Sequence, residues 1–296
     1  MPKIIQFLHT SVEATPENTN DTEIPWNNHT NHRRKFILSK GKYAKNGNYF
    51  EDNLVYWGEW EAQSKIEKLK NYKSHLPSFL NMPFLDPSVP ERTHNTDPYV
   101  FGQNFRYIVC KQGFFEVLRR LDPFSLILFG SCINKKFCLD TLFVVSEKKF
   151  NYNIENIENV FQEKNQYYYA SVNPLYDDTK FNNKVEQEDN CRIEKGNNYS
   201  FYKGVNFEEK KEYKGIFSYV PCKKFNSEKE TDFVFKQPAI ELDFIVNNQT
   251  QGLNACNGKD FTIQEIIEYW NKISEIITSA GLLHGVYFKT PPLNRG

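Results

Sequence analysis

The dipeptide Asn46-Gly47 constrains the fold more than any other local feature of this sequence. It stands between the apolar runs RKFIL and NLVYWGEW. A two-residue hairpin loop needs positive φ at both central positions, which asparagine and glycine tolerate best. The sequence therefore predicts an antiparallel hairpin with a fixed register. That register opposes three pairs of residues: Phe36 and Trp57, Arg34 and Glu59, and His32 and Glu61.

The segment YWGEWE, residues 56–61, concentrates aromatic and acidic side chains at the end of this hairpin. Side chains alternate between the two faces of a strand. Tyr56 and Trp60 are therefore expected on the core face, and Trp57, Glu59 and Glu61 on the opposite face. The opposite face has two interpretations, which the sequence leaves open. It is either a solvated ladder of cross-strand charge pairs or the polar wall of a cleft.

In the cleft interpretation, each polar residue has a role that follows from its chemistry. Carboxylates accept protons or hold donors, a tryptophan ring stacks on a flat ligand, and cations hold phosphate. No metal ligands are predicted, because the cations beside His32 would repel a metal ion. The predicted catalytic residues here are Glu59 and Glu61, and the predicted ligand-binding residues are His32, Arg34, Lys35 and Trp57.

Apolar runs elsewhere predict further strands at residues 3–8, 99–110, 125–130, 137–145, 216–222 and 239–246. A short helix is expected at 114–121, and the proline-containing stretch 66–98 is expected to be mostly loop.

The strongest helix signal lies near the end of the chain. Thr262 and Glu265 form a capping box, apolar residues follow at helical spacing, and Gly281 lies at the C-terminal cap. Aromatic residues make up 16% of the chain, which favours β-structure. We therefore expect a β-rich α+β fold with a mixed or antiparallel sheet and this helix packed on it. Residues 1–296 are expected to form a single domain with a polar insertion at about 146–200.

Composition restricts the classes of function. The chain has 37 basic and 37 acidic residues, so it lacks the excess positive charge of a protein that coats nucleic acid non-specifically. The six cysteines are irregularly spaced without a Cys-x2-Cys pair, and we expect reduced, mostly buried thiols. No signal peptide and no apolar run of about 18 residues is found, so we expect a cytoplasmic protein without a membrane span.

The segment LFGSCINKKFCLDTLFVV, residues 128–145, resembles the Gly-Ser and Asp-x-Asp signature of the nucleotidyltransferase fold. In that family the Gly-Ser turn holds nucleotide phosphates and carboxylates on the next strand hold magnesium. The resemblance implies phosphate binding at Gly130 and Ser131 and a catalytic role for Asp140. The second carboxylate position is Leu142, so the two-metal arrangement is incomplete.

A looser resemblance to ADP-ribosyltransferases is found in SFYKGVNF, residues 200–207, together with Glu241. The position that should be arginine is Lys203, and the Ser-Thr-Ser element of that family is missing from the sequence.

These patterns together predict a protein that binds a nucleotide or a nucleic-acid base in a polar–aromatic cleft, with nucleotide or nucleic acid as the partner. Whether such a protein would read its ligand or process it stays open. One alternative is a metal-dependent enzyme of the nucleotidyltransferase type, acting through Asp140 with Glu59 or Asp243. Another is a non-enzymatic protein-interaction domain. The sequence specifies no cofactor and no oligomeric state.

Overall fold

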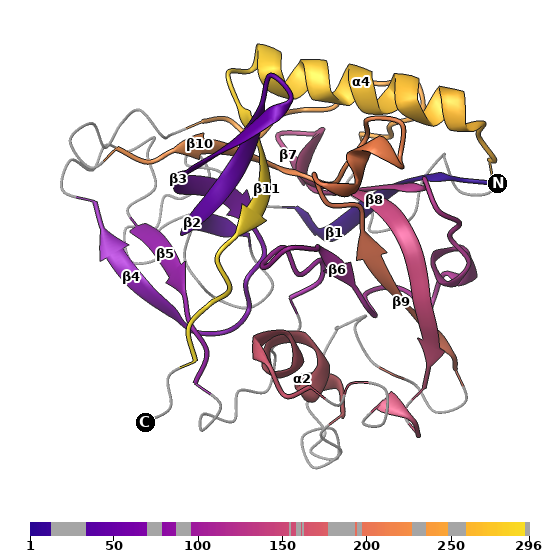
Figure 1. The fold of residues 1–296 in the computed structure, drawn as a ribbon, viewed down its shortest axis with the longest axis horizontal. Coiled ribbons are helices and arrows are strands. Elements are labelled where there is room, and N and C mark those ends of the chain that lie inside the picture. Colours follow the sequence, from indigo (N-terminus) through magenta and orange to yellow (C-terminus); the bar gives the residue numbers. More distant parts are fainter. Residues whose placement is uncertain are drawn as a thin grey trace.

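The computed structural model describes residues 1–12, 34–69, 79–86, 96–153, 155–157, 161, 163–176, 193, 197–226, 235–247 and 259–293. Within these residues the chain is rich in β-structure, with one five-stranded and one six-stranded sheet. Figure 1 shows the strands beneath helix α4 (Ile263–Ser279), which runs along the top of the view. The β-rich, mixed-sheet architecture expected from the sequence is confirmed.

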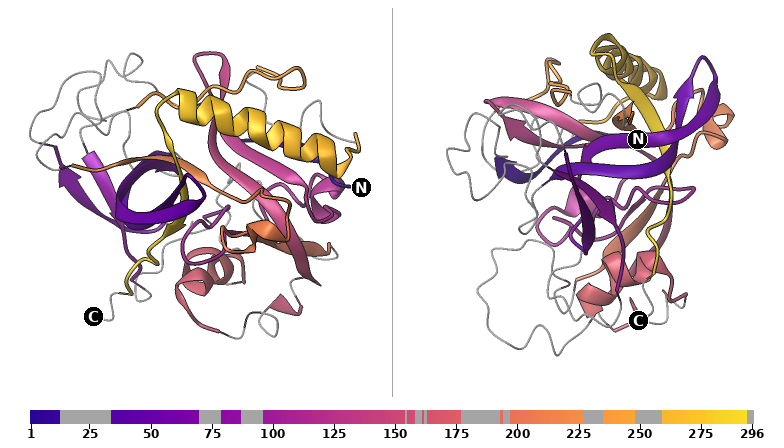
Figure 2. Two further views of the ribbon diagram at one scale, coloured as in Figure 1. Left: turned by 45° about the horizontal axis from the view of Figure 1, so that its top comes forward. Right: turned by 90° about the vertical axis from the view of Figure 1, so that its left-hand side faces the viewer.

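The six-stranded sheet is built around the predicted hairpin. Its strands are β2 (Lys35–Lys45), β3 (Asn48–Gly58), β4 (Ser64–Lys68), β5 (Phe79–Pro83), β10 (Val220–Lys224) and β11 (Leu283–Phe288). β2 pairs with β3, β3 with β10, β10 with β11, and β11 returns to β2. The pairing therefore closes on itself, which satisfies backbone groups that an open edge would expose. Figure 2 shows this part of the molecule from two further sides.

The predicted hairpin register is confirmed. Phe36 pairs with Trp57, and β2 and β3 pair without a bulge from Lys35–Gly58 to Lys45–Asn48. Asn46 and Gly47 have φ angles of 51° and 77°, the values that a two-residue loop of the predicted type requires. Local turn chemistry was therefore sufficient to fix the register.

The five-stranded sheet has the order β1-β7-β8-β9-β6. Its strands are β1 (Ile4–Val12), β6 (Arg106–Tyr107), β7 (Leu126–Ile133), β8 (Lys136–Tyr152) and β9 (Tyr199–Gly204). β1 and β7 are parallel, whereas the other pairs are antiparallel. β7 and β8 form a second hairpin, whose turn residues Asn134 and Lys135 also have positive φ.

Helix α4 begins as predicted. The Thr262 side chain accepts a hydrogen bond from the Glu265 backbone N–H, and the Glu265 carboxylate accepts one from the Thr262 N–H. Its buried residues, including Trp270 and Ile273, belong to the same core cluster as Leu128 of β7. The remaining helical segments are short: the 3-10 turns Glu116–Arg119 and Glu209–Lys211, the π-helical turn Tyr168–Val172 and helix α2 (Asn173–Tyr176). Among the described residues, no helix is long and apolar enough to cross a membrane.

Two hydrophobic clusters lie on opposite faces of the central strands. On β3, Leu54 and Tyr56 belong to one cluster, whereas Val55 and Trp57 belong to the other. β7 and β8 alternate in the same way, and each cluster contains residues of both sheets. The expectation of a single core face on β3 is therefore wrong, because both faces are buried over residues 54–58.

Several expected elements differ in the structure. Residues 66–98, expected to be mostly loop, contain β5 and most of β4. Only Arg106–Tyr107 of the strand expected at 99–110 is a strand, and the chain turns at Gly102, where φ is 84°. The helix expected at 114–121 is a single 3-10 turn. The strand expected at 239–246 is absent from the described residues, where only Ala239 forms a β-bridge.

Cys110 is disulfide-bonded, so the expectation of reduced thiols is wrong for this residue. Cys132, Cys138 and Cys222 are free and buried, as expected. Disulfides persist mainly in oxidising compartments, so the Cys110 bond counts against the cytoplasmic expectation.

We expect Gly130→Ala to lower the free energy of unfolding by about 2–3 kcal/mol, the cost of overpacking a rigid contact. A Cβ atom there would lie 2.2 Å from the Cys138 carbonyl oxygen and 2.7 Å from the Phe137 ring. Gly47→Ala is the matched control, because open space surrounds that position and only its positive φ is strained. The control should cost about 1 kcal/mol in urea denaturation. Equal losses in the two variants would contradict the close packing at Gly130.

Candidate functional site

A cluster of three buried charged residues joins the two sheets. Arg34 precedes β2, Glu59 follows β3, and Asp140 lies on β8. All three side chains are at most 4% exposed. The Arg34 Nε donates a hydrogen bond to the Asp140 Oδ2, and the Arg34 Nη2 lies 3.9 Å from the Glu59 Oε2. The predicted opposition of Arg34 and Glu59 across the hairpin is thus confirmed.

The third residue, Asp140, lies on β8, so the register of the β2–β3 hairpin does not predict its position. Burial raises the pKa of this carboxyl group, the Arg34 guanidinium opposes the rise, and the Glu59 carboxylate adds to it. The guanidinium contacts both carboxylates, so a metal ion held by both would have to take its place. Within the described ranges, no group of three or more His, Cys, Asp or Glu side chains could hold a metal ion.

The other residues of the predicted cleft wall are largely buried. Lys35 is 4% exposed at the first position of β2, and Trp57 is 2% exposed. The Trp57 ring packs edge-on against Phe36, with centroids 5.1 Å apart, so it is a core residue and not an exposed stacking platform. Glu61 is half-buried, and its backbone N–H donates to the Thr96 hydroxyl. His32 lies outside the described residues.

Gly130 and Ser131 are not in a turn. Both are buried inside β7, where they pair with Leu139 and Cys138 of β8. The turn of this hairpin comes three residues later, at Asn134 and Lys135. The expectation that Gly130 and Ser131 form a phosphate-binding turn is therefore wrong. Asp243, considered as a third acid, is exposed in a short turn.

Asp97 organises the segment between the two sheets. It is fully buried, and its carboxylate accepts backbone N–H hydrogen bonds from Ile108, Val109 and Cys110 at 2.8–3.0 Å. These partners lie 11 to 13 residues further along the chain, so the sequence around Asp97 does not indicate them. Burial raises the pKa of Asp97 to about 7, although the three N–H groups oppose the rise.

A cavity of about 470 Å³ opens beside this segment, and we call it the aromatic–basic cavity. It contains two cations, Arg106 and Lys203, which pair directly across β6 and β9. Its lining residues are Asn104, Arg106, Phe150, Phe161, Glu163, Asn165, Tyr167, Tyr168, Phe201 and Lys203. None of these residues was among the predicted site residues.

Aromatic rings form much of the wall of this cavity. Phe150 and Phe201 are stacked with centroids 5.1 Å apart, and Phe161 meets both rings edge-on. The Arg106 guanidinium lies 4.6 Å from the centroid of the Tyr167 ring, within cation–π range. Like charges opposed on adjacent strands repel each other, so an anion beside Arg106 is favoured at this position.

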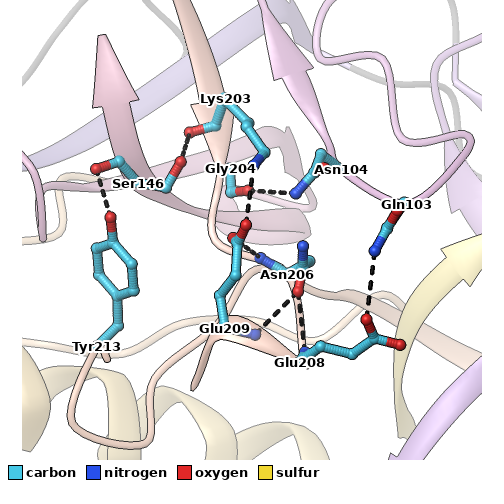
Figure 3. Close-up of polar contacts among 9 residues, drawn as sticks. All are labelled: Gln103, Asn104, Ser146, Lys203, Gly204, Asn206, Glu208, Glu209 and Tyr213. Carbon is cyan, nitrogen blue, oxygen red and sulfur yellow. Dashed lines mark hydrogen bonds and ion pairs between the residues drawn. The ribbon is translucent and has the colours of Figure 1, made fainter. Parts of the chain in front are cut away.

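The segment after β9 forms a network of polar contacts around Lys203 (Figure 3). The Lys203 Nζ lies 2.8 Å from the Glu209 Oε1, and the Asn206 side chain accepts hydrogen bonds from the Glu208 and Glu209 backbone N–H groups. The Asn104 amide donates to the Gly204 carbonyl. These bonds hold Lys203 in position but leave its partner across the strands, Arg106, without an ion pair to any described carboxylate.

Two features of the sequence could have indicated this cavity. Lys203 lies in SFYKGVNF, the segment that loosely resembles ADP-ribosyltransferases. Six further lining residues lie between Phe150 and Tyr168, in the stretch interpreted as a polar insertion. This stretch contains aromatic residues among its polar ones, and the chain returns to the sheet at β9.

We expect Arg34→Met to lower the free energy of unfolding by about 3–5 kcal/mol, because it leaves two buried carboxylates without their cation. Arg120→Met is the matched control: Arg120 forms an exposed ion pair with Glu116 and should contribute less than about 1 kcal/mol. Adding Glu59→Gln and Asp140→Asn to Arg34→Met should recover part of the loss. Similar urea midpoints for Arg34→Met and Arg120→Met would contradict a stabilising buried cluster.

Asp97 should make stability depend on pH. Its folded-state pKa of about 7 exceeds its ordinary value of 3.8, so the folded protein holds this proton more tightly than the unfolded chain. The stabilisation is complete below pH 3.8 and is lost as the pH rises through about 7, at about 1.4 kcal/mol per pH unit.

The measurement is the free energy of unfolding of the wild type and of Asp97→Asn between pH 4 and pH 8. The variant should be less stable than the wild type at every pH, since an amide nitrogen cannot accept a hydrogen bond. Its free energy of unfolding should not show the fall with rising pH that Asp97 causes in the wild type. Parallel profiles would contradict the assignment. A carboxyl carbon NMR titration of Asp97 tests the same pKa without a substitution.

Comparison with known proteins identifies no relative of this chain. No family model, no curated protein sequence and no solved structure matches it. The arrangement of the residues themselves is therefore the basis for any statement about function.

Proposed function

We propose that this chain binds a nucleotide, or a base of a nucleic acid, in the aromatic–basic cavity. The observation that carries the proposal is the position of Arg106. Its guanidinium lies at the cavity wall, stacked on Tyr167, and has no ion pair to a carboxylate among the described residues. A guanidinium in this state can bind phosphate through two parallel hydrogen bonds.

The rings of the cavity supply the second element of nucleotide binding. Bases stack on aromatic side chains, and each such contact contributes about 1–3 kcal/mol. Phe150 and Phe161 are only half-buried, so their rings face the cavity in part. The cavity volume of about 470 Å³ falls within the range of about 300–1,000 Å³ that is usual for small-molecule sites.

Polar side chains in the same wall can distinguish one base from another. Asn104, Asn165 and Glu163 offer amide and carboxylate groups next to the rings. Amides and carboxylates form hydrogen bonds with the exocyclic groups and ring nitrogens of bases. The proposal thus retains the ligand class expected from the sequence and moves the site away from the buried Trp57.

The test is calorimetric titration with AMP, GMP, CMP and UMP and with the corresponding nucleosides. We expect a nucleotide to bind about tenfold more tightly than its nucleoside, because one charge-assisted phosphate contact contributes about 1.5–3 kcal/mol. Arg106→Gln should remove this difference while keeping the weak binding of the nucleoside. Arg120→Gln, at an exposed arginine outside the cavity, should behave like the wild type.

If Arg106→Gln and Arg120→Gln bind equally well, the site is misplaced. If no nucleotide and no short oligonucleotide binds, while the mass in solution rises with concentration, the protein-interaction alternative replaces the proposal. Turnover of a nucleotide that needs a divalent metal and fails in Asp140→Asn would instead favour the metal-dependent enzyme.

A further inference from the structure

A second cavity, of about 420 Å³, is lined in part by sequence neighbours of residues that line the aromatic–basic cavity. We call it the aromatic–acidic cavity. Gln103 lines this one and Asn104 lines the first, and the segment from Lys203 to Glu208 likewise contributes to both (Figure 3). Its lining residues are Lys42, Tyr49, Glu51, Gln103, Asn206, Phe207, Glu208, Val286 and Tyr287.

The chemistry of this cavity is the opposite of that of the first. Three rings belong to its lining, and Tyr49 meets Phe207 edge-to-face with centroids 6.2 Å apart. Two carboxylates, Glu51 and Glu208, accompany them, and the Gln103 amide donates to Glu208 at 3.3 Å. Ring faces and carboxylates both attract cations.

Ammonium groups of the chain itself already lie on these rings. The Lys42 Nζ is 4.5 Å from the Tyr49 centroid, 5.6 Å from the Tyr287 centroid and 3.7 Å from the Glu51 carboxylate. The Lys210 Nζ lies 3.2 Å from the Phe207 centroid. These contacts show that each of the three rings already has a positive charge over its face.

Lys42 is a poor permanent occupant. Its side chain is 29% exposed and its partner Glu51 is 70% exposed, so their ion pair contributes little in water. The lysine can therefore turn outward at the cost of this weak ion pair and of its two cation–π contacts. With Lys42 turned away, Glu51 and Glu208 leave the cavity with two negative charges and no cation among its lining residues.

We propose that the aromatic–acidic cavity binds an alkylammonium group, and that Lys42 occupies the place of this group in the free protein. The ligand is a methylated lysine side chain of a partner or a small quaternary amine, since both present the same trimethylammonium head. Such a head is weakly hydrated, so it moves onto ring faces more readily than a primary ammonium. The inference does not depend on nucleotide binding, because the two cavities use different rings and charges.

The experiment is an NMR titration of protein labelled at the tyrosine rings, with choline as the first probe. The matched control probe is 3,3-dimethylbutanol, which has the shape of choline without the charge. Choline should shift the Tyr49 and Tyr287 ring signals saturably and bind about tenfold more tightly than the neutral alcohol, as expected of one desolvated cation–π contact. A peptide with trimethyllysine, compared with the same peptide with unmodified lysine, separates the two sources of the ligand.

Three variants test the assigned roles. Tyr49→Leu keeps an apolar wall without the ring and should weaken choline binding by about tenfold. Lys42→Gln removes the internal competitor and should strengthen binding by about threefold or more. Lys40→Gln, at an exposed lysine of the same strand outside the cavity, should leave binding unchanged.

Equal affinity for choline and 3,3-dimethylbutanol would overturn the proposal, since shape and not charge would then govern binding. Unchanged binding in Tyr49→Leu, or weaker binding in Lys42→Gln than in Lys40→Gln, would overturn it as well. A thermal melt of each variant confirms that a lost signal reflects lost binding and not unfolding.

Discussion

The buried cluster of Arg34, Glu59 and Asp140 is the interaction on which the arrangement of the two sheets depends. The first two residues belong to the ends of the β2–β3 hairpin, and the third belongs to the other sheet. Hydrophobic contacts between sheets tolerate small displacements, whereas a guanidinium between two buried carboxylates tolerates little. The cluster therefore fixes how the ends of the hairpin lie on β8, and the guanidinium offsets carboxylate charge buried in the core.

Residues 54–58 of β3 are buried on both faces, which leaves little surface for binding at that end of the hairpin. Lys42, Tyr49 and Glu51, nearer the hairpin turn, line the aromatic–acidic cavity, and Lys203 and Asn104 line the aromatic–basic cavity. One cavity presents cations with rings and the other presents carboxylates with rings. Backbone hydrogen bonds from Glu208 and Glu209 to the Asn206 side chain hold the segment that contributes to both sites.

Prediction from the sequence succeeded where the determining forces act within a few residues. The turn Asn46-Gly47 fixed the hairpin register, and the Thr262–Glu265 capping box fixed the start of α4, because each depends on local backbone geometry. Prediction failed for the environment of Trp57. This residue lies on the face of β3 opposite to Tyr56, as predicted, but that face is also buried. Strand alternation separates two faces and does not say what packs on either.

The amino-acid sequence by itself determined the hairpin, the opposition of Arg34 to Glu59, the capped helix and the β-rich class. Only the tertiary structure decided that Asp140 completes the charge cluster, that Asp97 binds the backbone of Ile108–Cys110, and that Arg106 lies opposite Lys203. The physical reason is sequence separation. These partners are 11 to 106 residues apart, and they meet only because packing of the apolar strands brings them together.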